Sequence, residues 1–129
     1  MEEALIALLL SHAPLTALLG QKIRPGRADQ ADVPPFAVVQ VIDSNRSYTL
    51  AGASGVVAAR VQIDVYADTY SAAKQAARLI EARLSGHRDQ FFQAIFLTDQ
   101  RDLPAADAGA VTTKFRTSID ITVHYGEQQ

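Results

Sequence analysis

The chain has 129 residues, of which 48% are hydrophobic and 20% charged, so it has enough apolar material for one core and too little charge for a disordered chain. Twelve basic and fourteen acidic residues give a formal net charge of −2, and no stretch concentrates Lys or Arg, which argues against nucleic-acid binding. The absence of cysteine excludes disulfides and Cys-ligated metals. We therefore expect a single domain over residues 1–129.

The first predicted elements are helical. Glu2 and Glu3 suit the positive end of a helix dipole, and the leucines after them recur at helical spacing. Pro14 can open a second short turn, which Gly20 closes as a C-terminal cap. The apolar run at residues 4–10 is far shorter than the ~20 residues needed to cross a bilayer, so we interpret it as a core helix and expect no membrane partner.

Four long strands are predicted in the rest of the chain, with a short additional strand at residues 22–24. Residues 36–42 are nearly continuously apolar, as in a strand covered on both faces, and residues 91–97 form another apolar run. Residues 57–66 and 115–125 alternate between apolar and mostly polar positions, so each should have one buried and one largely wet face. The side chains expected on the wet faces include Arg60, Gln62, Asp64, Arg116, Ser118 and Asp120.

A long helix is predicted between the second and third of these strands. Asp68 or Thr69 can cap it, and Gly86 follows where a helix ends. Its apolar stripe is rich in alanine, which allows close packing on a sheet. The predicted fold is α+β: an antiparallel-rich sheet of four to five strands, with one long helix and an N-terminal helical segment packed on it. The stripe comprises Ala73, Ala76, Ala77, Ile80 and Leu84.

Two long polar segments are predicted to be exposed connections between strands. Residues 43–55 are dense in turn-forming residues, and residues 98–113 contain three aspartates, a proline and a glycine. The aspartates lack the calcium-loop pattern, with its central glycine and final glutamate. These segments are therefore expected to contact partners rather than bind a metal.

Sequence motifs for catalysis or cofactor binding are absent. His12, His87 and His124 have no Asp or Glu at a metal-ligand spacing. The Gly-x-Ser-x-Gly elbow, the Gly-x-Gly-x-x-Gly loop and the Walker-type loop do not occur. We predict no catalytic residue, no cofactor, no metal and no enzymatic activity.

An ordered series of short segments along nearly the whole chain is similar to the tail-completion proteins of long-tailed phages, also called tail terminators or tail-to-head joining proteins. Related proteins occur in prophages and in phage-like gene-transfer particles. The segments are Gly26-Arg27-Ala28, Pro34-Pro35-Phe36-Ala37-Val38-Val39-Gln40, Tyr48-Thr49-Leu50, Ser54-Gly55, Arg60-Val61-Gln62-Ile63-Asp64-Val65-Tyr66-Ala67, Tyr70 with Ala73, Arg101-Asp102-Leu103, and Arg116-Thr117-Ser118-Ile119-Asp120.

The resemblance implies a structural protein of the virion tail, assembled in the host cytoplasm, with no catalytic residues. It implies a homo-oligomeric ring, of six subunits, that caps the tail tube protein and joins it to the head connector or stopper protein. DNA would pass through such a ring without specific binding, which a mildly acidic chain permits. Function would then reside in loops and edges. The residues that we expect at subunit or partner interfaces are Asp43, Asn45, Arg46, Tyr48, Asp99, Arg101, Asp102 and Asp107.

Two other classes of function remain open. A small oligomeric ligand-binding or regulatory module with a ferredoxin-like arrangement would have a similar order of elements, and a dimer with an apolar pocket would favour it. An enzyme with a composite site between subunits would be indicated by a polar interface cluster that includes a perturbed His or Asp.

Overall fold

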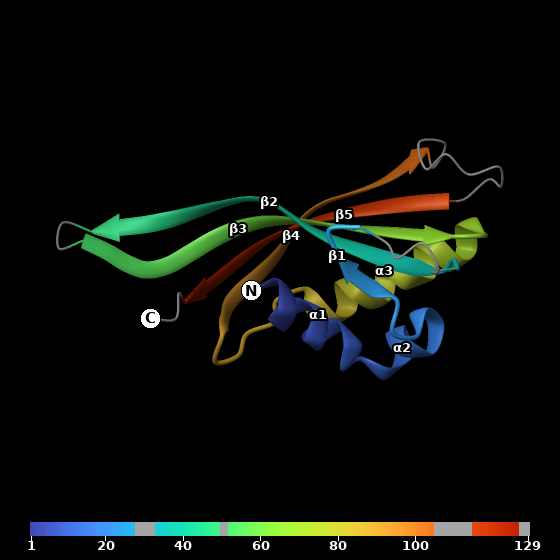
Figure 1. Cartoon of the computed structure of the whole chain (residues 1–129), viewed down its shortest axis with the longest axis horizontal. Coiled ribbons are helices and arrows are strands. Elements are labelled where there is room, and N and C mark those ends of the chain that lie inside the picture. Colours follow the sequence, from blue (N-terminus) through green and yellow to red (C-terminus); the bar gives the residue numbers. More distant parts are fainter. Residues whose placement is uncertain (28–32, 50–51, 105–114, 127–129) are drawn as a thin grey trace.

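The structure is a computed structural model that describes residues 1–27, 33–49, 52–104 and 115–126 (Figure 1). For residues 46–49, 52–55 and 103–104 the description covers the backbone alone. The elements are α1 (Glu2–Leu10), α2 (Ala13–Leu19), β1 (Ile23–Pro25), β2 (Phe36–Thr49), β3 (Gly52–Ala67), α3 (Tyr70–Leu84), β4 (Phe92–Pro104) and β5 (Phe115–Gly126).

The described strands form one five-stranded sheet in the order β1-β2-β3-β5-β4. β1 runs parallel to β2, and all the other neighbouring pairs are antiparallel. The helices lie on one side of the sheet: α3 contacts β3, β4 and β5, and α1 contacts β1 and β2 (Figure 1). This arrangement confirms the predicted α+β fold. We call the face that the helices cover the inner face and the opposite one the outer face.

The hydrophobic core lies between the helices and the inner face. The alternation in β3 and β5 predicted this face correctly, since Val61, Ile63 and Ile121 are each at most 1% exposed. The predicted stripe of α3 is also confirmed, with all five of its residues buried. The largest fully buried side chains are Phe92, Leu5, Leu9, Leu15, Leu19, Ile63, Ile80, Leu84, Ile95, Ile119, Ile121 and Val39.

The helix ends follow local chemistry. Thr69 caps α3, its Oγ1 accepting a hydrogen bond of 3.1 Å from the backbone N–H of Ala72. Gly20 ends α2 with a φ of 65°, a value at which a residue with a Cβ would be strained. Within the described residues no single helix is long and apolar enough to span a bilayer; α1 and α2 would be only as a pair, and they are bent by 93° at the break between them.

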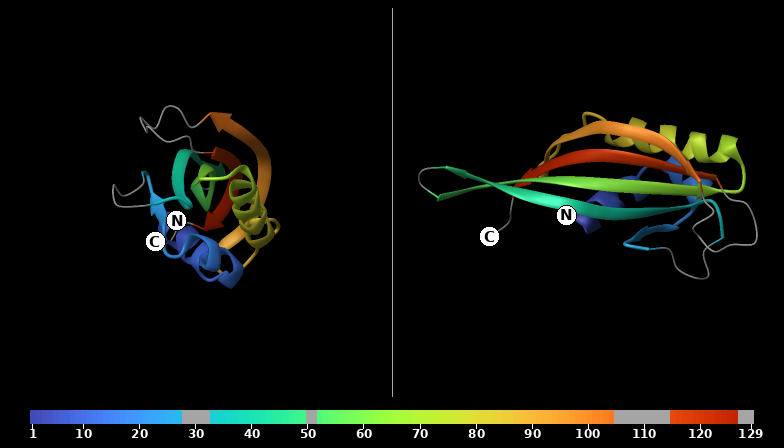
Figure 2. Two further views of the ribbon diagram at one scale, coloured as in Figure 1. Left: turned by 90° about the vertical axis from the view of Figure 1, so that its right-hand side faces the viewer. Right: turned by 90° about the horizontal axis from the view of Figure 1, so that it is seen from above.

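The prediction that residues 43–55 and 98–113 are exposed connections is wrong over much of both segments, because strands continue into them. β2 extends to Thr49 and pairs with β3, which already begins at Gly52. β4 extends to Pro104, and the remainder of the second predicted connection, 105–113, lies outside the described residues. Figure 2 shows the β2–β3 hairpin projecting beyond the helices. A ribbon with solvent on both faces needs no apolar alternation, so its sequence resembles a loop.

The described strand pairs contain four register shifts, and two of them decide which polar side chains of β2 and β4 face the helices. In β2, Val41 pairs with Val61 but Asp43 pairs with Arg60, so Ile42 is an extra residue. In β4 the register shifts in the same way between Leu97 and Asp99. Each bulge moves the residues after it to the opposite face from the one that simple alternation predicts.

Candidate interaction surface

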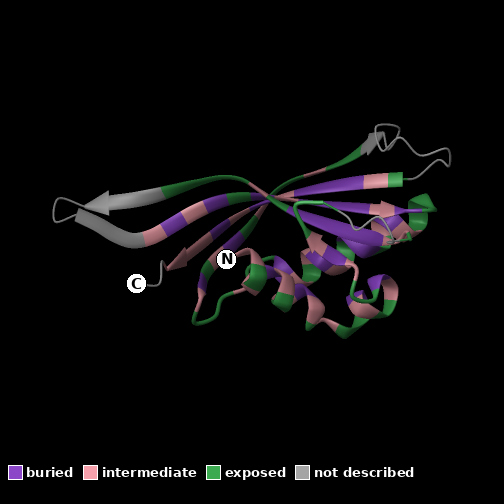
Figure 3. Cartoon of the chain, in the orientation of Figure 1, coloured by how far each residue is buried: buried purple, intermediate pink, exposed green. Residues whose placement is uncertain are grey.

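The outer face of the sheet is covered by none of the described helices and carries most of the charged strand residues. Exposed positions are concentrated in β2 and β4, while β3 and β5 are largely buried or intermediate (Figure 3). The strand register arranges the outer side chains in rows across β2, β3, β5 and β4. Three of these rows are Val38, Asp64, Ser118 and Arg101; Gln40, Gln62, Asp120 and Asp99; and Asp43, Arg60, Thr122 and Phe96.

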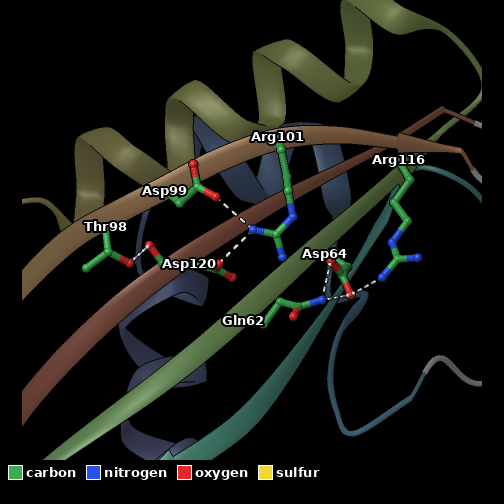
Figure 4. A network of polar contacts seen from close by, with 7 residues as sticks. All are labelled: Gln62, Asp64, Thr98, Asp99, Arg101, Arg116 and Asp120. Atoms are coloured by element: carbon green, nitrogen blue, oxygen red, sulfur yellow. Dashed lines mark hydrogen bonds and ion pairs between the residues drawn. The ribbon is translucent and has the colours of Figure 1, made fainter.

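Arg101 lies at the centre of the first ion-pair network on this face (Figure 4). Its Nη1 donates to the Asp120 carboxylate at 2.9 Å and to the Asp99 carboxylate at 2.8 Å. These contacts raise the pKa of Arg101 above its usual value, with the Asp120 hydrogen bond as the largest cause. The Thr98 hydroxyl donates to the backbone carbonyl of Asp120 at 3.0 Å, which ties the bulge of β4 to β5. The network has two carboxylates to one guanidinium and is therefore locally acidic.

A second network on the same face is centred on Asp64 (Figure 4). Arg116 donates to the Asp64 carboxylate at 3.0 Å, and the Gln62 amide donates to both of its oxygens at 3.0 and 3.1 Å. The Arg116 guanidinium also lies 5.6 Å from the centroid of the Tyr66 ring, which is stacked on Phe36. This end of the face is held together by aromatic, cationic and hydrogen-bonded contacts.

The prediction of a largely wet outer face is wrong at two positions. Asp64 is 6% exposed and Ser118 is 0% exposed, although Arg60 and Asp120 lie on the accessible surface as expected. Ser118 is short and lies in register between Asp64 and Arg101, so longer neighbours cover it. Alternation alone cannot reveal this, because it does not include the lengths of cross-strand neighbours.

The predicted interface residues of the first segment all belong to β2. Asp43 and Asn45 pair with Arg60 and Ala58, and both are exposed. The Asp43 carboxylate lies 3.5 Å from the Arg60 guanidinium. Arg46 and Tyr48 are paired with β3 through the backbone, at Val57 and Ala53. These four residues therefore lie along one strand of a projecting hairpin rather than in a loop.

The predicted interface residues of the second segment are divided between the two faces of β4. Asp99 and Arg101 are brought together on the outer face, as described above, whereas Asp102 points toward α3. Asp107 lies outside the described residues. Asp102 is therefore the one described candidate whose contacts join the sheet to the helical layer.

Asp102 joins β4 to α3 and β5. Its carboxylate accepts from Lys74 Nζ at 2.8 Å, from the Thr117 hydroxyl at 3.1 Å and from the Tyr70 hydroxyl at 3.4 Å. The Lys74 hydrogen bond is the main reason that the pKa of Asp102 lies below its usual value, and the same bond raises the pKa of Lys74. Asp102 thus stabilises the end of β4 rather than offering a free carboxylate to a partner.

A cluster that the sequence did not predict holds the turn between α3 and β4. The Asp89 carboxylate accepts from the backbone N–H groups of Phe91 and Phe92, both at 2.7 Å, and lies 2.8 Å from His87 Nε2. Arg83 lies 3.4 Å from His87 Nδ1. If Nδ1 accepts a hydrogen bond from Arg83, the neutral ring carries its proton on Nε2, which then donates to Asp89. The spacing of two residues between His87 and Asp89 was the available signal.

Replacing Asp89 by asparagine should change how stability depends on pH. Hydrogen bonds from Phe92, then from His87 and Phe91, hold the pKa of Asp89 below its usual value. The ionised carboxylate therefore stabilises the fold fully above about pH 4, and this contribution is lost as pH falls through the folded pKa. We expect Asp89→Asn to be less stable than the wild type at pH 7, with a difference that shrinks at pH 3. Urea midpoints at both pH values measure this, Asp68→Asn serves as a surface control, and an unchanged difference contradicts it.

No three His, Cys, Asp or Glu residues within the described ranges gather closely enough to hold a metal ion. The networks on the outer face instead pair carboxylates with guanidinium groups. This chemistry suits recognition of a charged protein surface by exchange of ion-pair partners.

Comparisons with known proteins give one family and one fold. The sequence model of the family described as "Tail completion protein gp17" matches residues 3–123. No curated protein matches the sequence significantly. Among solved structures, a chain of "Virion of native gene transfer agent (GTA) particle" is similar with a TM-score of 0.70 and 15% sequence identity, over 95% of this chain and 91% of that chain. At this identity the likeness shows a shared fold.

Proposed function

Because the chain belongs to the tail-completion family whose model matches residues 3–123, we propose that it caps the tail tube and joins it to the head connector as a ring. The protein is a structural component of the phage virion tail. The finer role requires one surface for tail tube subunits, another for the head connector, and a third for neighbouring copies. We propose six subunits, with DNA passing through the ring and no catalytic step.

The observation that carries this proposal is the sheet, which combines a charged outer face with a hairpin projecting past the helices (Figure 2). An outer face of paired charges is too polar for a permanently buried hydrophobic seam, but it suits contacts that form during assembly. With such contacts the subunits can be monomeric in dilute solution and can close into a ring on a tail end that acts as a template.

Deleting the gene in the particle that encodes it tests the proposal. We expect filled heads and separate tails to accumulate, with tails of uncontrolled length, because nothing stops tube growth or bridges the two parts. Electron microscopy counts joined particles, separate heads and separate tails, and supplying the wild-type gene in trans should restore joining. Normal numbers of joined particles in the deletion would contradict the proposed role, and averaged images of isolated tail ends measure the number of subunits.

A further inference from the structure

The sheet has two edges on which the described residues place no further strand, and they run in opposite directions. β1 pairs with β2 only from Ala37 to Val39, so no strand of the described ranges lies on that side of β2 from Gln40 onward. β4 is the last strand at the opposite edge. Because β2, β3, β5 and β4 are successively antiparallel, β2 and β4 are antiparallel to each other. The β2 edge of one copy can therefore lie antiparallel to the β4 edge of the next.

The β2 edge presents an exposed apolar side chain beside a carboxylate. Ile42, the extra residue of the bulge, is 46% exposed, and Asp43 follows it. Among the described side chains, Asp43 forms a 3.5 Å ion pair with the well-exposed Arg60, a contact that contributes little in water. This edge therefore has an apolar group and an available negative charge side by side.

The β4 edge presents the complementary features. A half-open hollow of about 220 Å³ lies between the turn after α3 and β4, and its lining is mainly apolar apart from Arg88 and Gln93. Phe96, which is 55% exposed, and Arg88, which provides a positive charge, both belong to its lining. Asp89 holds this turn through its bonds to Phe91 and Phe92, so the hollow is preformed.

The two features lie at the same level along the strands. Asp43 pairs with Arg60, Arg60 with Thr122, and Thr122 with Phe96, so the bulge of β2 and the lining of the hollow are the two ends of one row. A contact between unlike surfaces produces a ring when it adds rotation, and a helical filament when it also adds a translation along the axis. Features at one level allow the contact without a shift along the strands.

We propose that copies of the chain associate head to tail, with Ile42 of one copy in the hollow beside β4 of the next and Asp43 facing Arg88 there. The proposal rests on the proposed ring and assigns the surface through which its subunits meet. The partner is a second copy of this chain, because the apolar group with its negative charge and the apolar hollow with its positive charge are both present on one molecule. The Arg101 network then remains accessible on the outer face.

Cross-linking tests the contact directly, because the chain has no native cysteine. Particles carrying both Ile42→Cys and Phe96→Cys, treated with a short bismaleimide, should give a ladder of multimers that ends at the ring size. A mixture of the two single variants should give dimers and no larger species, and each single variant alone should give none, because the contact joins unlike surfaces. The matched control pairs Ile42→Cys with Tyr70→Cys, since Tyr70 is 52% exposed but lies on α3.

Charge reversal gives a second measurement that does not depend on the cysteines. Asp43→Arg and Arg88→Asp should each reduce joined particles by about tenfold or more, the usual effect of opposing like charges across an interface, and the double variant should restore most of the loss. Circular dichroism must show that all three are folded. Failure of the double variant to improve on both single variants would overturn the proposed contact.

The outcomes also separate this contact from the proposed function. If particles contain the double-cysteine protein but treatment yields only monomer, the contact is wrong while the role in joining stands. If the deletion strain joins heads to tails normally, the role is wrong, and cross-linking of concentrated purified protein still decides the contact.

Discussion

Replacing Val61 by aspartate is expected to destabilise the protein by roughly 4–5 kcal/mol, enough to unfold a domain of ordinary stability. Val61 is 1% exposed and is paired in the sheet with Val41 and Ile121. A carboxylate there would lose its hydration, and the apolar neighbours offer it neither a hydrogen bond nor a positive charge. Urea unfolding followed by circular dichroism should show little folded protein at 25 °C.

Two control variants separate the cost of burying a charge at residue 61 from the loss of apolar contact and from a change on the outer face. Val61→Ala removes apolar contact without adding charge and should cost roughly 2 kcal/mol, while Arg60→Ala changes the next residue on the outer face and should stay within about 0.5 kcal/mol. A Val61→Asp protein with a wild-type urea midpoint would mean that β3 does not bury this face.

Reversing the charge of Arg101 is expected to leave the protein folded and to abolish most head–tail joining. Arg101→Glu places a third carboxylate beside Asp99 and Asp120, so a network with one guanidinium between two carboxylates becomes a concentrated negative patch. The side chain is 42% exposed, so the fold can relax it into solvent, whereas a partner that pairs with the network meets repulsion. Counting joined and separate particles by electron microscopy, beside circular dichroism of the purified variant, measures both parts.

The matched control is Arg78→Glu, the same charge change at an exposed position of α3. It should leave joining unchanged, and Arg46→Glu in the β2–β3 hairpin should behave like Arg101→Glu. Normal joining by both Arg101→Glu and Arg46→Glu would show that these strands are not the working surface. Failure of Arg78→Glu as well would indicate that net charge, rather than position, is responsible.

The parts of the fold that the sequence predicted correctly are those with one face in the core. In β3 and β5 the buried apolar residues recur at every second position, and in α3 the buried stripe follows helical spacing. These patterns exist because each element exchanges one face with water and the other with the core. The cap at Thr69 and the turn at Gly20 were predictable from local backbone chemistry alone.

The parts that could not be predicted lack that contrast between two faces. The part of β2 after the bulge has a polar sequence that is typical of a turn. It is held as a strand by backbone pairing with β3. In β4 the bulge at Thr98 breaks the alternation at the point where the apolar run ends. To predict these segments one must know which strand each of them pairs with, and a single sequence does not contain that information.

The candidate surface was predicted in its location more than in its contacts. The pairing of Arg101 with Asp99 connects residues two apart on one strand, but its bond to Asp120 and the bond of Arg116 to Asp64 join residues on different strands. Asp102 was assigned to an interface because it lies in the segment 98–113 that was predicted to be an exposed connection, yet the bulge turns it toward Lys74. Local sequence therefore identified a charged region and could not divide it between two faces.

The extra residue Ile42 determines which face of the sheet each following residue of the hairpin occupies. Regular strand residues alternate between the two faces, and the extra residue Ile42 is what leaves Asp43, paired with Arg60, on the outer face; if Ile42 took the pairing with Arg60 instead, Asp43 and Asn45 would turn to the inner face. Adding or removing two residues beyond the bulge would keep every side chain on its present face and would change only the length of the hairpin. The length of this arm is thus free to vary in steps of two, while single steps exchange its two surfaces.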